Sequence, residues 1–165
     1  MIKTTLTVIL MFVASIAFSA DCRSLQEYRL LDFWLGDWDV YVGDQKVGTN
    51  KIEPILNSCA VIENWKDATS AEGKSFFYFD LADKVWKQIW VTDQGFMKEK
   101  TQQKSPAKGE VTFQGQVLSL KGKKVLDRTS LVVERKGVRQ IIEQSEDAGQ
   151  TWTVTFNAIY VHPEK

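Results

Sequence analysis

Residues 151–160 read Thr-Trp-Thr-Val-Thr-Phe-Asn-Ala-Ile-Tyr, an alternation of small polar and mostly bulky apolar side chains. Successive side chains of a β-strand point to opposite faces, so a period of two predicts a strand with one buried face. That face is predicted to carry Trp152, Val154, Phe156, Ala158 and Tyr160. Val111, Phe113 and Val117 repeat the alternation earlier in the chain. These segments indicate an all-β fold.

Other period-two segments lie upstream and are separated by short turns. The expected strands are 38–43, 47–56, 59–67, 74–82, 85–93, 96–104, 110–120, 125–136, 138–146 and 151–162. Such short connections join antiparallel neighbours, so the chain is expected to meander. Because closure removes the two exposed edges of an open sheet, we predict a closed antiparallel up-and-down β-barrel of about ten strands. Ser24 and Glu27 form a capping box that predicts a short helix before the sheet.

The first twenty residues are typical of a secretory signal peptide. Lys3 precedes an apolar run over 6–18, and small residues follow. A retained transmembrane helix is the alternative, but the run is shorter than a membrane span requires. The sequence therefore predicts a signal peptide at 1–20 and one domain at 21–165. The mature protein is expected to be periplasmic or secreted, with no membrane insertion after cleavage.

The charges and cysteines limit the partners and the compartment. The chain has 21 basic and 21 acidic residues, and removal of Lys3 with the signal peptide leaves 20 against 21. No basic surface for nucleic acid is expected from this balance. Export to an oxidising compartment predicts a disulfide between Cys22 and Cys59, the only two cysteines. Two unrelated thiols are the alternative.

Residues 145–152 read Ser-Glu-Asp-Ala-Gly-Gln-Thr-Trp and resemble an Asp-box. In this hairpin Asp147 can accept backbone amides, Gly149 can take a positive φ, and Trp152 can pack beneath the loop. Asp-boxes are known from sialidases, but a sialidase propeller carries several copies and needs a far longer chain. The motif is therefore interpreted as a structural hairpin between the last two strands.

A second resemblance covers most of the mature chain. Residues 32–38 read Asp-Phe-Trp-Leu-Gly-Asp-Trp, and further matching segments lie at 48–52, 59–65 and 86–91, followed by the Asp-box. This order resembles a family of exported bacterial proteins of unknown function with an Asp-Phe-Trp-Leu-Gly-x-Trp signature. The start is also similar to that of lipocalins and nitrobindin-like haem barrels. The resemblance implies a lipocalin-like barrel with Trp38 closing one end, and it implies no particular reaction.

The same strands place polar side chains beside aromatic ones, which predicts a mixed polar and aromatic lumen if these faces point inward. The predicted ligand-binding residues are Asn50, Glu63, Trp65, Gln88, Trp90, Arg128, Gln140, Gln144, Phe156 and Tyr160. Arg128 is expected either to pair with Glu63 or to hold a ligand carboxylate. Alternatively, these residues face outward or form an internal network without a ligand.

The chemistry of the chain favours binding over catalysis. His162 is the only histidine, which disfavours a catalytic triad or a multi-histidine zinc site, and no catalytic residue or metal site is predicted. We therefore expect a binding protein for a small, partly apolar molecule that carries an anionic or amide group, without a cofactor. A haem or nitric-oxide barrel using His162 as the haem ligand is the alternative, because residue 162 shares the parity of Tyr160. A hydrolase or isomerase using Glu63 or Glu143 is a third hypothesis.

Overall fold

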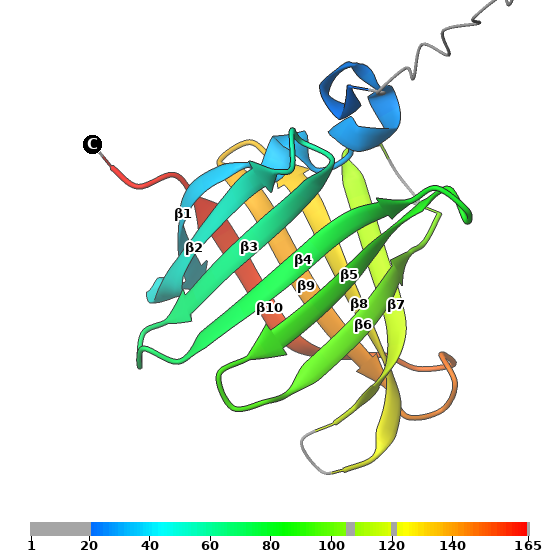
Figure 1. The fold of residues 1–165 in the computed structure, drawn as a ribbon. Coiled ribbons are helices and arrows are strands. Elements are labelled where there is room, and N and C mark those ends of the chain that lie inside the picture. The colour runs from blue at the N-terminus through cyan, green and yellow to red at the C-terminus, as the bar shows by residue number, and fades with distance from the viewer. Residues whose placement is uncertain (1–20, 105–107, 120–121, 165) are drawn as a thin grey trace, which may run out of the picture.

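Ten antiparallel strands form a closed barrel (Figure 1). The computed structural model describes residues 21–104, 108–119 and 122–164. The strands are β1 (Gly36–Val42), β2 (Gln45–Ile55), β3 (Ala60–Asp67), β4 (Glu72–Asp80), β5 (Val85–Thr92), β6 (Met97–Gln102), β7 (Glu110–Leu118), β8 (Lys124–Glu134), β9 (Gly137–Ser145) and β10 (Thr153–Val161). Each strand pairs with its sequence neighbour, and β10 closes on β1. The predicted up-and-down barrel is confirmed.

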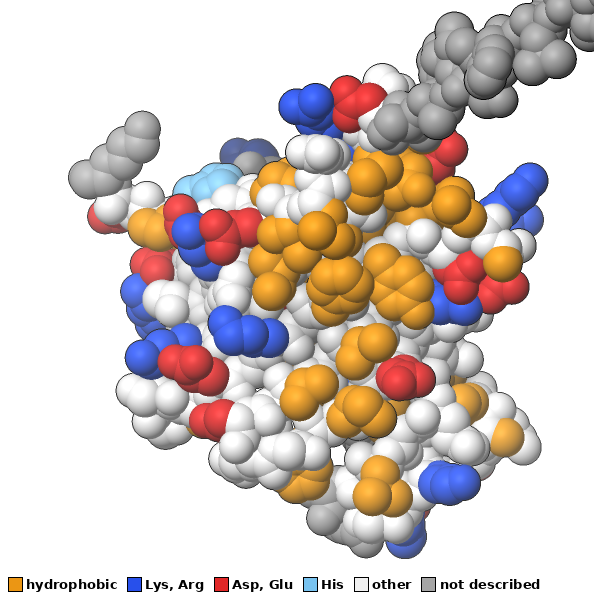
Figure 2. All heavy atoms as spheres, viewed as in Figure 1, with side chains coloured by type: hydrophobic (Ala, Val, Ile, Leu, Met, Phe, Trp, Pro, Cys, Tyr) orange, Lys and Arg blue, Asp and Glu red, His pale blue; other side chains and the backbone are white. Residues whose placement is uncertain are grey.

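Alternation along the strands divides the side chains between core and surface. In β4, Phe77 is buried in the barrel, whereas its neighbour Phe76 is 37% exposed on the outside. Figure 2 shows other hydrophobic side chains gathered on this outer surface, and Val91 of β5 is among the exposed ones. These outward residues explain why β4 and β5 carry bulky groups on both faces.

The pairing around the barrel is uneven. β6 and β7 are joined by two residue pairs, Thr101 with Gln114 and Gln102 with Phe113. Among the described residues this is the shortest ladder of the barrel, since even β1 and β10 share three pairs. The seam between β6 and β7 therefore has the shortest ladder, which one further hydrogen bond continues from the Gln103 amide to the Thr112 carbonyl at 2.8 Å.

One end of the barrel is covered by the N-terminal segment, which forms three 3-10 turns: η1 (Cys22–Ser24), η2 (Gln26–Arg29) and η3 (Asp32–Trp34) (Figure 1). Leu31 and Trp34 from this segment are completely buried. The Trp34 ring meets Phe77 edge-on at 5.7 Å, and its carbonyl accepts a 2.8 Å hydrogen bond from the Trp38 indole. Trp38, which was expected to close this end, thus lies beside a second tryptophan that fills it.

The turn at the start of this segment differs from the predicted capping box. Asp21 caps η1 by accepting a hydrogen bond from the backbone amide of Arg23, and η2 begins after Leu25 without a side-chain cap. The predicted short helical segment is present as 3-10 turns, whereas the cap predicted from Ser24 and Glu27 is wrong because these turns begin at other residues.

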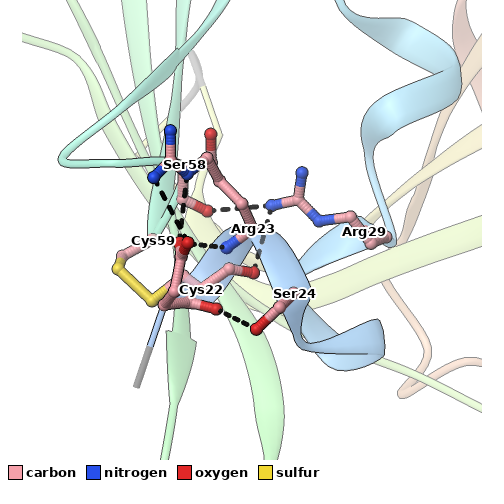
Figure 3. Close-up of a disulfide and its surroundings, with 7 residues drawn as sticks. Cys22, Arg23, Ser24, Arg29, Ser58 and Cys59 are labelled. Carbon is pink, nitrogen blue, oxygen red and sulfur yellow. Dashed lines mark hydrogen bonds and ion pairs between the residues drawn. A yellow bond between two sulfur atoms is a disulfide. The ribbon is translucent and has the colours of Figure 1, made fainter. Parts of the chain in front are cut away.

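The predicted disulfide between Cys22 and Cys59 is confirmed (Figure 3). Arg29 lies beside it and donates hydrogen bonds to the carbonyl of Ser58 at 3.1 Å and to that of Cys22 at 3.5 Å. A structural disulfide indicates a non-cytoplasmic environment. The predicted signal peptide at 1–20 lies outside the described residues. Within the described part of the chain, no helix is long and apolar enough to cross a membrane.

Loss of this disulfide is expected to lower the free energy of unfolding by roughly 2–4 kcal/mol, because the bond closes a long loop in the unfolded chain. The measurement is denaturant unfolding of wild type and the Cys22→Ser, Cys59→Ser double variant. Reduction of the wild type serves as an independent control and should give the same change. Equal stability of the oxidised and reduced wild type would show that the segment is held by packing alone.

The Asp-box forms a hairpin between β9 and β10, as predicted. Asp147 accepts hydrogen bonds from the Thr151 amide at 2.9 Å and from its hydroxyl at 2.6 Å. Gly149 has a φ of +92°, and the Trp152 indole donates to its carbonyl at 3.1 Å. These hydrogen bonds lower the pKa of Asp147 to about 2, with Thr151 the main cause.

A β-bulge follows the hairpin and changes which residues face inward. Val154 pairs with Glu143 while Phe156 pairs with Ile142, which leaves Thr155 as an extra residue. Phe156 and Tyr160 therefore face the lumen, but Val154 is 53% exposed. The prediction that Trp152 and Val154 share the buried face is wrong because the bulge shifts the alternation by one residue.

Candidate ligand-binding cavity

The barrel contains a cavity of about 520 Å³ that opens at the end opposite the N-terminal turns. Phe96, Ser119 and Glu146, from three loops at that end, contribute to its lining. At the other end the lining residue Tyr160 packs against the buried ring of Trp34 at 6.0 Å, so the N-terminal segment fills that end. The cavity is therefore a pocket with one mouth.

Most of the predicted ligand-binding residues meet in this cavity. Those that line it are Glu63, Trp65, Gln88, Trp90, Gln140, Gln144, Phe156 and Tyr160. Asn50 lies directly behind the lining and donates a 2.7 Å hydrogen bond to Glu63. The strand alternation thus placed these side chains on one face of the sheet.

Arg128 is placed differently. Its neighbour Thr129 lines the cavity, so the alternation of β8 turns Arg128 to the outer face. There its guanidinium donates to Glu143 at 2.8 Å and lies 4.0 Å from the centre of the Trp152 ring. Neither the predicted pair with Glu63 nor a role in holding a ligand inside the barrel is correct. Glu143, a predicted acid or base, also lies outside the lumen.

Glu63 is the centre of a polar network at the bottom of the cavity. It accepts hydrogen bonds from Asn50 and from the Ser75 hydroxyl. Gln88 in turn donates to Ser75 at 3.1 Å, and Tyr160 donates to Gln140 at 2.8 Å. Burial raises the pKa of Glu63 above its ordinary value, although the bonds from Ser75 and Asn50 oppose this shift. The sequence places Glu63 at this position on the inner face, as expected.

A second polar cluster consists of Lys98, Lys100 and Asp127, none of which was predicted. Asp127 is completely buried and pairs with both lysines, with Lys98 at 2.8 Å. Lys100 also donates to Thr129. Burial lowers the pKa of Lys100 to about 8 against the attraction of Asp127. Burial alone would raise the pKa of Asp127, but the two lysines hold it below its ordinary value.

Gly115 of β7 makes this cluster possible. It is the register partner of Asp127, and it lies beside Lys100 on the other side. A Cβ atom at position 115 would lie 3.2 Å from the Lys100 Cα and far too close to the Glu99 carbonyl. Because β7 has no side chain here, Lys100 reaches over it to Asp127. No local motif in the sequence signals this contact between three strands.

Aromatic side chains form the part of the cavity wall nearest the mouth. The Trp65 ring covers Gly48, where a Cβ would lie 2.6 Å from the indole. Trp90 covers Gly73 in the same way, at 2.9 Å. Phe156 meets Trp65 edge-on at 6.4 Å. The two glycines therefore make room for the indole rings to lie flat along the inner wall.

His162 lies outside this cavity. Its ring stacks on Trp38 with the centroids 4.0 Å apart, Nδ1 is 3.1 Å from the Asp37 carbonyl, and the residue is exposed. The expectation that the ring points into the lumen is wrong, so this position gives no support to haem ligation inside the barrel. Within the described ranges, no three His, Cys, Asp or Glu side chains gather into a metal site.

Comparison of the chain with protein-family models and with curated proteins gives no match. The closed barrel agrees with the lipocalin-like architecture that the sequence predicts. The resemblance to a family of exported bacterial proteins stays a prediction, as does the family signature at residues 32–38.

Proposed function

We propose that this chain is an exported protein that binds a small, partly apolar molecule inside the barrel. The observation that carries the proposal is the cavity of about 520 Å³, open at one end. Binding sites for small molecules commonly measure 300–1,000 Å³ and combine apolar walls with a few placed polar groups. A barrel built only for stability has no need of such a space.

Part of the cavity wall changes from apolar to polar with depth, which supports an amphipathic ligand. On β3 and β5 an apolar lining residue near the mouth is followed, two residues deeper, by a polar one, and on β9 the same step lies below Gln144. The pairs are Trp65 and Glu63, Trp90 and Gln88, and Ile142 and Gln140. A ligand with an apolar body and a polar end matches this order.

The test uses N-phenyl-1-naphthylamine, a neutral apolar dye whose fluorescence rises in apolar surroundings. We expect saturable binding to the wild type. Ile142→Trp, which fills the cavity, is expected to weaken binding at least about tenfold, a loss near 1.4 kcal/mol. Ile141→Trp on the outer face of β9 is the matched control and should bind the dye like the wild type.

Circular dichroism and thermal unfolding of both variants establish that they are folded. Absence of saturable dye binding by the wild type would contradict the proposal, and so would equal binding by the two variants. Native mass spectrometry of the protein from its own host can then identify a retained ligand by mass.

A further inference from the structure

We infer that the ligand is an amphipathic monoanion whose carboxylate-like group pairs with Lys98 while its apolar body lies against Trp65 and Trp90. The inference rests on the proposed function and names the class of molecule that the same cavity takes. Lys98 thereby takes the role in binding a ligand carboxylate that the sequence predicts for Arg128, which lies outside the barrel.

The first step is the charge of the buried cluster. Two lysines share one carboxylate, Asp127, so the three groups together carry one excess positive charge when ionised. The side chains of Lys100 and Asp127 are 3% and 0% exposed, so water can do little to stabilise this charge. A buried charge without a counter-ion is costly, and an anion in the cavity would offset that cost.

Other carboxylates that line the cavity do not supply this counter-ion. Both oxygens of Glu63 are occupied by neutral partners, Asn50 and Ser75, and within the described residues it attracts Lys100 only from beyond ion-pair distance. Burial raises the pKa of Glu63 and so disfavours the charged form that would offset the lysines. Glu146 lies at the rim with a side chain that is 64% exposed, and its partner is Lys123. The excess positive charge therefore remains on the side of the cavity formed by β6.

Lys98 is the member of the cluster that a ligand can reach. Its side chain is 22% exposed and lines the cavity, whereas Lys100 lies deeper. One hydrogen bond goes to Asp127, and an ammonium has three N–H donors, so donors remain for a ligand. The Trp90 ring lies 5.4 Å from the same ammonium. An anion at Lys98 would thus form charge-assisted hydrogen bonds beside an apolar wall.

The surroundings of Lys98 define the rest of the ligand. Trp65, Trp90, Ile142 and Phe156 provide an apolar inner wall. Phe96, Met97 and Leu118 continue this surface to the mouth, where they are 41%, 55% and 59% exposed. An apolar chain or ring system attached to the anionic group would cover these side chains.

The test compares three molecules with the same ten-carbon chain: decanoate, decanol and decyltrimethylammonium. Each displaces the bound dye in a competition titration below its micelle-forming concentration. We expect decanoate to bind about tenfold or more tightly than decanol, with the cation weakest, as charge-assisted bonds at Lys98 require. In Lys98→Met the ratio of the decanol to decanoate dissociation constants is expected to fall to about one.

Lys74→Met is the matched control, since Lys74 is exposed on β4 and bonds Asn64 outside the barrel. This variant should keep the wild-type ratio. Equal affinities for decanoate and decanol, an unchanged ratio in Lys98→Met, or no displacement of bound dye by any of the three would overturn the inference. The proposed function would survive each of these results, because it fails only if the dye itself does not bind the cavity.

Discussion

Replacement of Asp127 by alanine is expected to lower the free energy of unfolding by roughly 3–5 kcal/mol, because it leaves two lysines without their carboxylate. Lys100 is the more damaging of the two, since its side chain is 3% exposed and cannot turn to water. Urea denaturation of the purified variant, followed by tryptophan fluorescence, measures the change.

Two further variants make the result specific. Asp127→Leu combined with Lys100→Met removes both buried charges and is expected to recover most of the lost stability. Glu72→Ala breaks an exposed ion pair with Lys66 on the outside and should cost less than about 1 kcal/mol. If Asp127→Ala costs no more than Glu72→Ala, the buried cluster is better solvated than its burial indicates.

Trp34→Ala is expected to lower the free energy of unfolding by roughly 3–5 kcal/mol, the usual cost of deleting a large buried aromatic side chain. The ring is completely buried at the closed end, where it meets Phe77 at 5.7 Å and Tyr160 at 6.0 Å. Thermal unfolding monitored by near-ultraviolet circular dichroism gives the change, because the signal reports the packing of these aromatic rings.

Trp152→Ala is the matched control for that experiment. Trp152 lies on the outer face, against the guanidinium of Arg128. Cation–π contacts at such positions contribute about 0.5–2 kcal/mol, so this variant should be clearly less destabilised than Trp34→Ala. The reverse order of the two variants would mean that the Asp-box hairpin, not the N-terminal segment, is essential to the barrel.

The barrel and its disulfide could be predicted from the sequence because their signals are local or few in number. Short turns between period-two segments permit antiparallel neighbours only, and two cysteines allow one intramolecular pair. The start of the N-terminal helical turns was harder to predict, since Ser24 and Glu27 fit a capping box that the short 3-10 turns do not form.

The inner face was predictable where alternation was uninterrupted. Glu63 and Trp65, or Gln88 and Trp90, are separated by two residues and share a face in the structure. The prediction that Arg128 faces the lumen failed because β8 carries polar residues on both faces, so hydrophobicity does not mark the inner side of this strand. The bulge at Thr155 could not be foreseen, because one extra residue leaves no mark on composition.

The lysine cluster was missed for a different reason. Lys98 and Lys100 lie in a short, highly charged strand that looks like a solvated surface segment. Their partner Asp127 is on β8, and the contact depends on the missing side chain of Gly115 on the strand between them. Only the three-dimensional closeness of β6, β7 and β8 reveals that these charges are buried together.

The sparse pairing of β6 with β7 has a kinetic consequence. Only two ladder pairs must separate here, so local opening of this seam depends mainly on the ion pairs by which Lys98 and Lys100 reach across β7 to Asp127. Lys98 and Lys100 lie on β6, and Leu118 at the mouth lies on β7, so a ligand that contacts them would bridge the seam. Occupancy would then slow this local opening, and the rigidity of the wall would be linked to the presence of the ligand.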